Sequence, residues 1–386
     1  MGRLVAVVAE GSPGFVTALR RVWEDGDAVL PLDPRLPGPA RDRLLAALRP
    51  AALLDPDPGG RDGEEVALDA GAPPVEAGDA LVVPTSGTTG QPKGVVLTHD
   101  AVVAHARAVH ARLEVTGADR WLACLPLAHV GGLGVVTRAL VDGVGLDLLP
   151  RFEEAAVAAA RDRGATLTSL VPTALDRVGA EGWRWVVLGG AADTAAARPA
   201  NVVRTWGLTE TGGGIAYDGA PLAGVEVAAV GGELWVRSPT LLRGYRRPDG
   251  TVEDPRRDRP GGGPGWLPTG DAGEVRDDGT VVVWGRQGDM IVTGGENVWP
   301  EAVEAVLRRV PGVAEVAVAG RPDPGWGQRV EAWVVPSDPA SAPTLDALRA
   351  AVAAELAPWA APRALHLVAA LPRTALGKVR RSELSG

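Results

Sequence analysis

The segment from Pro84 to Gly94, Pro-Thr-Ser-Gly-Thr-Thr-Gly-Gln-Pro-Lys-Gly, constrains the fold more than any other part of the chain. Apolar runs at 80–83 and 95–97 flank it, which predicts a strand, a loop and a second strand. Its glycines allow backbone N–H groups to converge, its hydroxyls add donors, and its lysine adds a positive charge. Such a loop is suited to binding a polyphosphate. The residues expected to contribute are Thr85, Ser86, Gly87, Thr88, Thr89, Gly90 and Lys93.

The loop differs from the phosphate loop of kinases and GTPases, G-x-x-x-x-G-K-[ST]. Here Gly87 and Gly90 lie three residues apart, and Lys93 is followed by glycine. The segment instead resembles the phosphate loop of the acyl-adenylate-forming enzymes, which include acyl-CoA synthetases, firefly luciferase and peptide-synthetase adenylation domains. A surface turn rich in glycine and hydroxyl residues is the alternative, although such a turn would not need the lysine.

Composition limits the classes of protein and partner. At 386 residues the chain is longer than one hydrophobic core usually supports, so two or more domains are expected. A net charge of -9 and a pI near 5.2 argue against nucleic acid or an anionic membrane surface as partner. The single cysteine, Cys124, excludes an internal disulfide framework. The sequence has no signal-peptide pattern and no apolar run of ~18 residues, so we expect a cytoplasmic protein without integral membrane contact. The sequence leaves open whether the protein forms a homodimer.

Lysine is rare in this chain. Of 39 basic residues only two, Lys93 and Lys378, are lysines. Arginine would serve wherever only positive charge is needed, so a retained lysine suggests a site that requires a compact ammonium group. Survival of two lysines by chance is the alternative interpretation.

Apolar patterns predict alternating strands and helices in the N-terminal part. Strands are expected at 4–9 and 28–32, with helices at 14–24 and 39–49. Residues 55–78, rich in Pro, Gly, Asp and Glu, are typical of a surface connection. Further on, a strand–helix rhythm predicts a parallel sheet. Its expected strands are 144–149, 166–171 and 185–189, and its helices are 152–163 and 172–179.

The sheet type changes later in the chain. Residues 225–245 alternate apolar and polar side chains, which indicates antiparallel strands. Residues 248–265 are expected to form a mobile insertion because Pro, Gly, Arg and Asp dominate them. A last group predicts a compact α/β unit. It comprises strands at 313–319, 330–335 and 365–368 and a helix at 344–356.

These elements define the expected fold class, which is α/β. We predict a large N-terminal domain of parallel α/β sheets with a small β subdomain, and a small mobile C-terminal α/β domain. The N-terminal domain is expected to span 1–285 and the C-terminal domain 290–386. The segment 286–289 is polar and contains a glycine, and the resemblance implies that it is the hinge between them.

His129 follows a strand-like run at 121–126, and open α/β sheets bind ligands beyond the carboxyl ends of their strands. The resemblance implies a P-x-x-H element that lines the acyl pocket, while a structural histidine is the alternative. His99, His105 and His110 do not have the i, i+4 spacing of a helical metal site, so core or solvated histidines are expected.

The segment 205–211, Thr-Trp-Gly-Leu-Thr-Glu-Thr, offers a ring, a hydroxyl and a carboxylate within a few residues. These groups could stack on a base, contact a phosphate and hold Mg²⁺. The segment is similar to the family's [YW]-G-x-T-E element. The resemblance implies that Trp206 lies at the base, Thr209 near the α-phosphate and Glu210 at the metal. An ordinary buried tryptophan before a glycine loop is the alternative.

The remaining site residues depend mainly on the resemblance, to which the rarity of lysine adds support for Lys378. A Gly-Gly-Ala turn at 189–191 would lie against adenine, and Asp271 of a T-G-D element and Arg286 would contact the ribose. The loop that begins Gly294-Gly295 would border the pantetheine arm of coenzyme A, and Lys378, in a P-x-T-x-x-G-K-like tail, would be the catalytic lysine. The turn residues are Gly189, Gly190 and Ala191.

The family's chemistry is activation of a carboxylic acid by MgATP as acyl-AMP, followed by transfer to a thiol such as CoA. About 84 residues precede the phosphate loop, fewer than in many relatives, and with the segment 209–225 this looks like the o-succinylbenzoate-CoA ligases of menaquinone biosynthesis. Another aryl- or acyl-CoA ligase and a ligase that loads a carrier protein remain open. A protein that senses ATP without turnover would be expected to lack Glu210 or Lys378.

Overall fold

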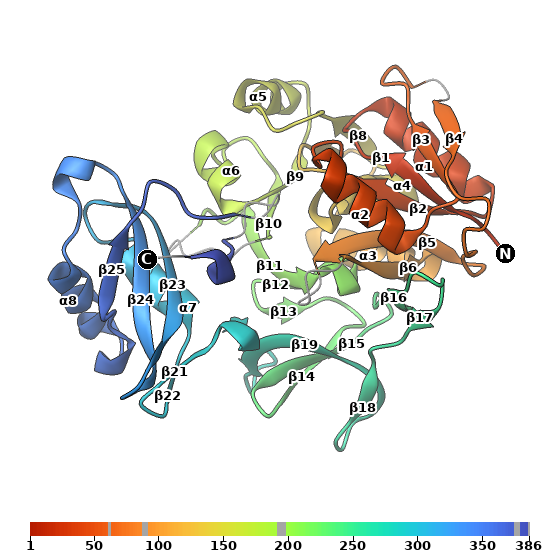
Figure 1. Ribbon diagram of the computed structural model, residues 1–386. Coiled ribbons are helices and arrows are strands. Elements are labelled where there is room, and N and C mark those ends of the chain that lie inside the picture. The colour runs from red at the N-terminus through yellow and green to blue at the C-terminus, as the bar shows by residue number, and fades with distance from the viewer. Residues whose placement is uncertain (61–62, 87–91, 191–197, 374–378, 385–386) are drawn as a thin grey trace.

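The computed structural model describes residues 1–60, 63–86, 92–190, 198–373 and 379–384 (Figure 1). These described residues form four β-sheets, three in an N-terminal domain and one in a C-terminal domain with its own apolar core. The α/β class and the division into a large and a small domain are therefore as predicted.

The first sheet combines parallel and antiparallel strands. β1, β2, β3 and β5 are parallel, and β4, β6, β16 and β17 join them antiparallel. All five residues of β2 are buried, as expected for a strand covered on both faces. In sheet order the strands are β17 (Val252–Glu253), β16 (Gly244–Arg246), β6 (Pro92–Thr98), β5 (Asp79–Ser86), β2 (Ala28–Leu32), β1 (Leu4–Val8), β3 (Ala52–Asp55) and β4 (Glu64–Ala67).

The second sheet is the predicted parallel βαβ sheet. Five of its strands are parallel, and β12 and β13 extend it antiparallel. In sheet order the strands are β13 (Ala220–Pro221), β12 (Gly213–Tyr217), β11 (Val202–Leu208), β10 (Trp185–Leu188), β9 (Leu167–Leu170), β7 (Arg120–Ala123) and β8 (Gly145–Leu148). Its connecting helices are α4 (Val130–Asp142), α5 (Glu154–Asp162) and α6 (Pro172–Val178).

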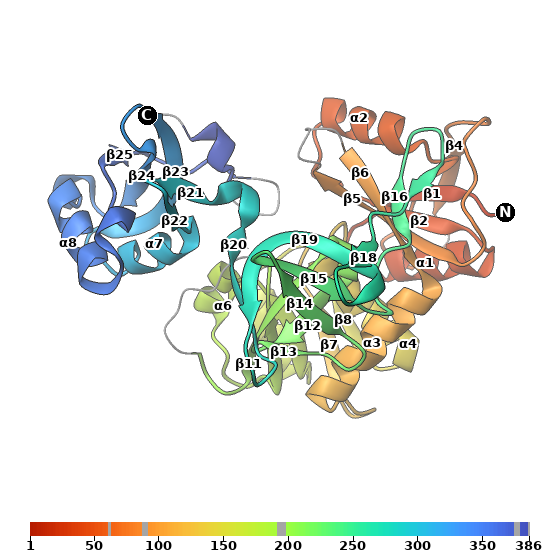
Figure 2. The ribbon, with the colours of Figure 1, turned by 90° about the horizontal axis from the view of Figure 1, so that it is seen from below.

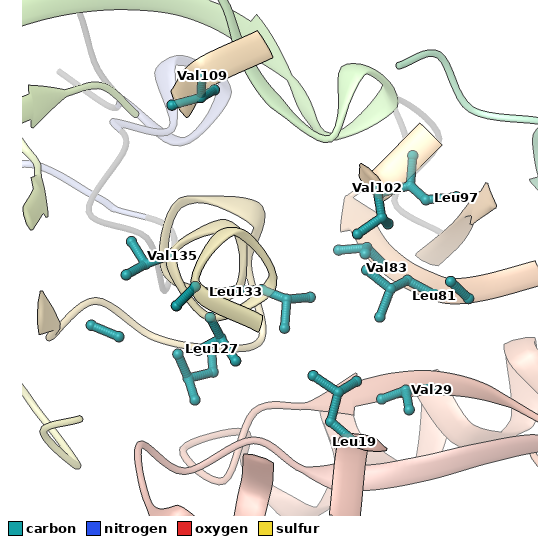
Figure 3. Packing of buried hydrophobic residues seen from close by; sticks show 14 of the residues in the cluster. Leu19, Val29, Leu81, Val83, Leu97, Val102, Val109, Leu127, Leu133 and Val135 are labelled. Carbon is teal, nitrogen blue, oxygen red and sulfur yellow. The ribbon is translucent and has the colours of Figure 1, made fainter. Parts of the chain in front are cut away.

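Helices α3 (His99–Leu113) and α4 lie between these two sheets and bury much of the main core. Leu133 of α4 and Val102 of α3 face strand residues such as Leu81 and Val83 (Figure 3). Thr98 caps α3 by accepting a hydrogen bond from the Ala101 N–H at 3.1 Å. Helices α1 (Pro13–Glu24) and α2 (Gly38–Leu48) complete the domain.

Helix α4 is absent from the expected elements. Its sequence is apolar on almost every side and contains three glycines, so no helical period separates it from its flanks. Its burial between the two sheets explains this composition, because a helix covered on all sides needs no polar face.

The third sheet is the predicted antiparallel subdomain, and Figure 2 shows its long strand β19 arching between the first sheet and the C-terminal domain. Its strands are β14 (Glu226–Val230), β15 (Glu233–Arg237), β19 (Gly263–Val275), β18 (Arg257–Arg259) and β20 (Val281–Arg286).

The C-terminal domain packs two helices, α7 (Pro300–Leu307) and α8 (Leu345–Glu355), with one sheet. β25 is parallel to β24, and the other pairs are antiparallel. The strands are β21 (Ile291–Thr293), β22 (Glu296–Val298), β23 (Val313–Asp323), β24 (Gly327–Pro336) and β25 (Ala364–Leu367). Short 3₁₀ turns are η1 (Thr209–Thr211), η2 (Gln287–Asp289), η3 (Pro339–Ser341), η4 (Pro358–Ala360) and η5 (Arg381–Glu383).

Two expected irregular segments contain strands. The stretch 55–78 includes β4, which pairs with β3 at the edge of the first sheet, and 248–265 includes β17 and β18. The composition concealed these strands because edge strands bury few side chains: the β4 residues are mostly exposed. Among the described residues, no helix combines the length and apolarity needed to cross a membrane.

Candidate active site

The hairpin β5–β6 carries the proposed phosphate loop at its tip. Thr85 pairs with Lys93 and Ser86 pairs with Pro92, so the hairpin holds Thr85 and Lys93 opposite each other at the base of the loop. Gly87, Thr88, Thr89 and Gly90 lie outside the described residues.

Lys93 and Glu210 meet at Tyr245, a residue that no sequence motif indicated. The Tyr245 hydroxyl donates a hydrogen bond to Glu210 Oε1 at 2.9 Å. The Lys93 ammonium lies over the Tyr245 ring, with Nζ 5.1 Å from the ring centroid. Tyr245 thereby joins the phosphate-loop hairpin to the proposed metal ligand. A weaker sequence signal existed, because the chain contains only two tyrosines.

The Tyr245 hydroxyl is held in its protonated form. Burial, together with the negative charge of Glu210, raises the pKa of Tyr245 well above its ordinary value, and the nearby Arg286 charge opposes this only in part. A protonated phenol donates and a carboxylate accepts, so the Tyr245–Glu210 hydrogen bond persists across the neutral pH range.

The structure also brings together Trp206, Asp271 and Arg286. The Trp206 indole N–H donates to Asp271 Oδ2 at 2.8 Å, and Arg286 Nε lies 3.0 Å from Asp271 Oδ1. Asp271 and Arg286 are register partners on β19 and β20, while Trp206 comes from β11 of the second sheet. Because Asp271 already has these two contacts, any contact of the carboxylate with a ribose would share its oxygens with Trp206 and Arg286.

The turn after β10 packs closely on β11. A Cβ added to Gly189 would lie 2.8 Å from Thr205 Oγ1, and Gly190 adopts a positive φ of 82° that glycine accommodates. Thr205 Oγ1 donates to the Leu188 carbonyl at 3.0 Å, which fixes this contact. Ala191 lies outside the described residues.

Thr209 and Glu210 belong to η1, which precedes Gly212. The Gly212 N–H donates to the Thr209 carbonyl at 3.0 Å, and the Leu242 N–H donates to the Glu210 carbonyl at 2.7 Å. Glu210 is thus fixed by its backbone as well as by Tyr245. A single carboxylate is compatible with Mg²⁺, which commonly binds one or two carboxylates together with substrate phosphates.

His129 lies at the N-terminus of α4. Its Nε2 is 3.8 Å from Asp33 Oδ2, and Asp33 also accepts a 2.8 Å hydrogen bond from Arg35 Nε. The Arg35 contacts and the His129 charge lower the pKa of Asp33 although burial opposes them. Sequence reasoning missed Asp33 and Arg35, since β2 carries no motif that points to His129.

A cavity of about 10 Å³ lies between α3, α4 and the Gly212 turn. His105 borders it and donates through Nε2 to the Gly214 carbonyl at 3.1 Å. Burial, with the nearby Arg138 charge, lowers the pKa of His105 to about 3, so the ring is neutral. His110 is also a core histidine, because it accepts from Trp121 and contacts Asp142 at 2.6 Å.

Arg138 of α4 places a buried positive charge near this cavity. Its side chain is only 4 % exposed, and within the described part of the chain no carboxylate forms an ion pair with it. Its Nε donates to the Gly134 carbonyl at 2.6 Å, whereas Nη1 is buried without a described hydrogen-bond partner. A Cβ at Gly134 would lie 3.4 Å from Arg138 Nη2 and 3.8 Å from the Gly212 carbonyl oxygen, which places the guanidinium close to the cavity.

The C-terminal site residues lie in another part of the molecule. Gly294 and Gly295 form the β21–β22 turn, and a Cβ on Gly294 would lie 2.6 Å from the Trp326 ring. Both glycines adopt positive φ, 60° and 86°, so a side chain would strain this turn. Lys378 lies outside the described residues.

Sequence comparison identifies the family. The model of the AMP-binding enzyme family matches residues 1–246, and that of the AMP-binding enzyme C-terminal domain matches residues 302–378. The chain belongs to the AMP-binding enzyme family. A protein of Mycobacterium tuberculosis, named as a probable 2-succinylbenzoate–CoA ligase, is 40% identical over 393 residues, covering 96% of this chain and 94% of its own length.

Other members of this family are similar over most of the chain. The 2-succinylbenzoate–CoA ligase of Bacillus licheniformis is 33% identical over 340 residues, which cover 79% of this chain and 69% of the relative. The o-succinylbenzoate CoA synthetase (MenE) of Bacillus subtilis, solved with the acyl-adenylate intermediate OSB-AMP, superimposes with a TM-score of 0.80. At 25% identity, that match covers 100% of this chain and 88% of the solved one.

Proposed function

We propose that this AMP-binding enzyme is an acid–thiol ligase that activates a carboxylate with MgATP and transfers the acyl group to CoA. The observation that carries this proposal is the convergence of Lys93, Glu210 and Arg286 around Tyr245, from three separate segments. The cations Lys93 and Arg286 and the proposed metal-binding carboxylate of Glu210 lie close together. Such a group suits a triphosphate that is attached to a ribose.

The proposed reaction has two steps. The acid needs activation because a free carboxylate has no good leaving group of its own. In the first step, its carboxylate oxygen attacks the α-phosphorus of ATP, and pyrophosphate leaves. The CoA thiol then attacks the acyl carbon, and AMP leaves. Lys93 and Lys378 would stabilise phosphate charge, and Thr209 would contact the α-phosphate. Mg²⁺ held by Glu210 would add neutralising charge.

The acid we propose is 2-succinylbenzoate, and the product is 2-succinylbenzoyl-CoA for menaquinone biosynthesis. Two relatives carry this activity in their names, and a third was solved with its adenylate. A dianionic acid also fits Arg138, because this buried guanidinium stacks on Trp121 but has no described carboxylate partner, and its Nη1 has no described hydrogen bond. We assign Arg138 to the second carboxylate and His129 to the wall of the acyl pocket.

The two steps need different surfaces of the C-terminal domain. We propose that residues 1–285 and 290–386 are the two domains and that 286–289 is the hinge, which coincides with η2 between β20 and β21. Rotation there would withdraw Lys378 after adenylation and bring the Gly294–Gly295 turn towards CoA. The ligase would act in the cytoplasm, where its free, buried Cys124 stays reduced.

The test is mass spectrometry of AMP and thioester products after incubation with ATP, Mg²⁺, CoA and a panel of acids. We expect AMP and a thioester with 2-succinylbenzoate, and neither product when ATP is omitted. A thioester only with other acids would assign the chain to another aryl- or acyl-CoA ligase. AMP formation with 2-succinylbenzoate and a carrier protein, but no CoA thioester, would favour the carrier-loading alternative.

A further inference from the structure

Tyr245 is placed at the nucleotide site by sheet topology. It lies on β16, which is next to β6 (Figure 2) and pairs antiparallel with it. Tyr245 is the register partner of Val95. Val95 is two residues beyond Lys93 on the same strand, so the two strands bring the Tyr245 ring beneath the lysine.

The two ends of the Tyr245 side chain have different contacts. The hydroxyl donates to Glu210 Oε1 at 2.9 Å, and the ring face receives the Lys93 ammonium at 5.1 Å from its centroid. The side chain is half-buried and packs against the main core, so its orientation is fixed from behind. Lys93 and Glu210 can therefore hold a constant separation through one rigid group, although Lys93 lies on β6 and Glu210 in the turn η1.

We propose that Tyr245 is a positioning residue of the nucleotide site, whose hydroxyl orients the Glu210 carboxylate for Mg²⁺ and whose ring seats the Lys93 ammonium for the phosphates. This inference rests on the proposed MgATP-dependent function. Groups that hydrogen-bond to a metal-binding carboxylate fix its rotamer, and their loss typically costs about 10–100-fold in metal affinity. A cation over an aromatic face is attracted by the ring, so the ring contributes separately from the hydroxyl.

The two contributions can be separated with two variants. Tyr245→Phe removes the hydroxyl and keeps the ring, whereas Tyr245→Leu removes both. Calorimetric titration with MgATP, and with ATP in EDTA, measures binding with and without the metal. We expect Tyr245→Phe to weaken MgATP binding about tenfold and to leave metal-free ATP binding unchanged. Tyr245→Leu should weaken both.

Two further variants serve as controls. Tyr217→Phe removes the hydroxyl of the chain's other tyrosine, which is buried in the core, and should bind MgATP as the wild type does. In a Glu210→Gln background, Tyr245→Phe should cause no further loss, because the carboxylate that it orients is already absent. Thermal unfolding checks that each variant is folded.

Two results would overturn the proposal: unchanged MgATP binding by Tyr245→Phe, or an equal loss of MgATP and metal-free ATP binding in that variant. The second result would indicate a general disturbance of the site. Failure of the wild-type enzyme to bind MgATP would instead refute the proposed function, so the two hypotheses are tested separately.

Discussion

At the scale of single residues, what a buried arginine can bind depends on whether its N–H groups already have hydrogen-bond partners. Arg246 is as buried as Arg138, but its guanidinium donates to backbone carbonyls of Leu48, Pro73 and Pro74. Arg138 has a described partner for Nε and Nη2 but none for Nη1. The two arginines therefore differ in what they can offer a ligand, and only Arg138 has donor capacity left beside the cavity.

Arg138→Met should impair binding of a dianionic acid. Removing one partner of a buried charge pair commonly costs 2 kcal/mol or more, so we expect KM for 2-succinylbenzoate to rise about 30-fold or more. Steady-state kinetics on an acid panel provides the measurement. A monocarboxylic benzoate analogue should show no comparable change, and calorimetric MgATP binding should be retained. Equal loss for both acids would contradict the assignment.

His105→Gln should make stability less dependent on pH. The folded protein holds the His105 pKa at about 3, below its ordinary 6.5, so the folded state excludes a proton that the unfolded state binds. The stabilisation is complete above pH 6.5 and is lost as the pH falls from there towards 3. Glutamine can still donate to the Gly214 carbonyl but does not titrate.

The measurement is urea unfolding at several pH values. The wild type should lose about 1 kcal/mol more per pH unit than His105→Gln below pH 6.5. The half-buried His99, whose pKa burial also lowers, serves as the comparison, and His99→Gln should have a smaller effect. Parallel pH profiles of the wild type and His105→Gln would refute the prediction.

At the scale of elements, one arginine connects the C-terminal tail to the proposed hinge. Arg381 of η5 lies 2.8 Å from Asp289 of η2 and 2.9 Å from both Glu301 and Glu304 of α7. Glu304 is buried, and its Oε1 also accepts from the Val318 N–H of β23 at 2.9 Å. Three acidic groups thus share one guanidinium, which joins four elements of the domain.

Arg381→Ala should destabilise the C-terminal domain. Its removal takes a shared cation from Glu301 and from the buried Glu304, which keeps its 3.2 Å contact with the cation of Arg308. Loss of one partner costs about 3 kcal/mol in comparable buried pairs. The neighbouring Arg380 pairs with Glu383 at the surface, so Arg380→Ala should cost less than about 1 kcal/mol. Urea unfolding of the full chain distinguishes them. Equal stability of the two variants would show that the Arg381 network contributes little.

At the scale of the whole molecule, one substitution should affect adenylation without affecting thioester formation. Lys378→Ala should slow adenylation about 100-fold or more, because it removes a charge that stabilises the transferring phosphate. Formation of thioester from supplied acyl-AMP and CoA should be largely spared, since the proposed rotation would withdraw the lysine in that step.

Pyrophosphate exchange measures the first step, and thioester formation from synthetic acyl-AMP measures the second. Arg373→Ala provides a matched control from the same tail, because Arg373 pairs with Glu315 at the surface and should affect neither step. Equal loss of both steps in Lys378→Ala would contradict the proposed rotation.

Contiguous motifs made the family predictable and indicated much of the proposed site. Phosphate loops and short carboxylate elements carry their ligand groups within a few residues, so Lys93, Glu210 and Asp271 could be proposed as site residues from local sequence. Tyr245 and Arg138 could not. Each is a single residue in an element without a motif. Its proposed role depends on its contacts with residues in distant segments.

The same distinction applies to the fold. The βαβ rhythm predicted the parallel sheet because apolar period and turn residues are local properties. The apolar helix α4 and the exposed strand β4 were not predicted from the sequence. Burial of a helix and the edge position of a strand depend on the elements that pack beside them.

The sequence by itself determined the chemistry available to this chain: a phosphate-binding loop, a carboxylate beside a ring, and two retained lysines. Only the tertiary structure decided which of these groups act together, since strand order places β16 against β6 and so sets Tyr245 between Lys93 and Glu210. The physical reason is that contacts between strands distant in sequence depend on packing of the whole core, which no local pattern of residues encodes.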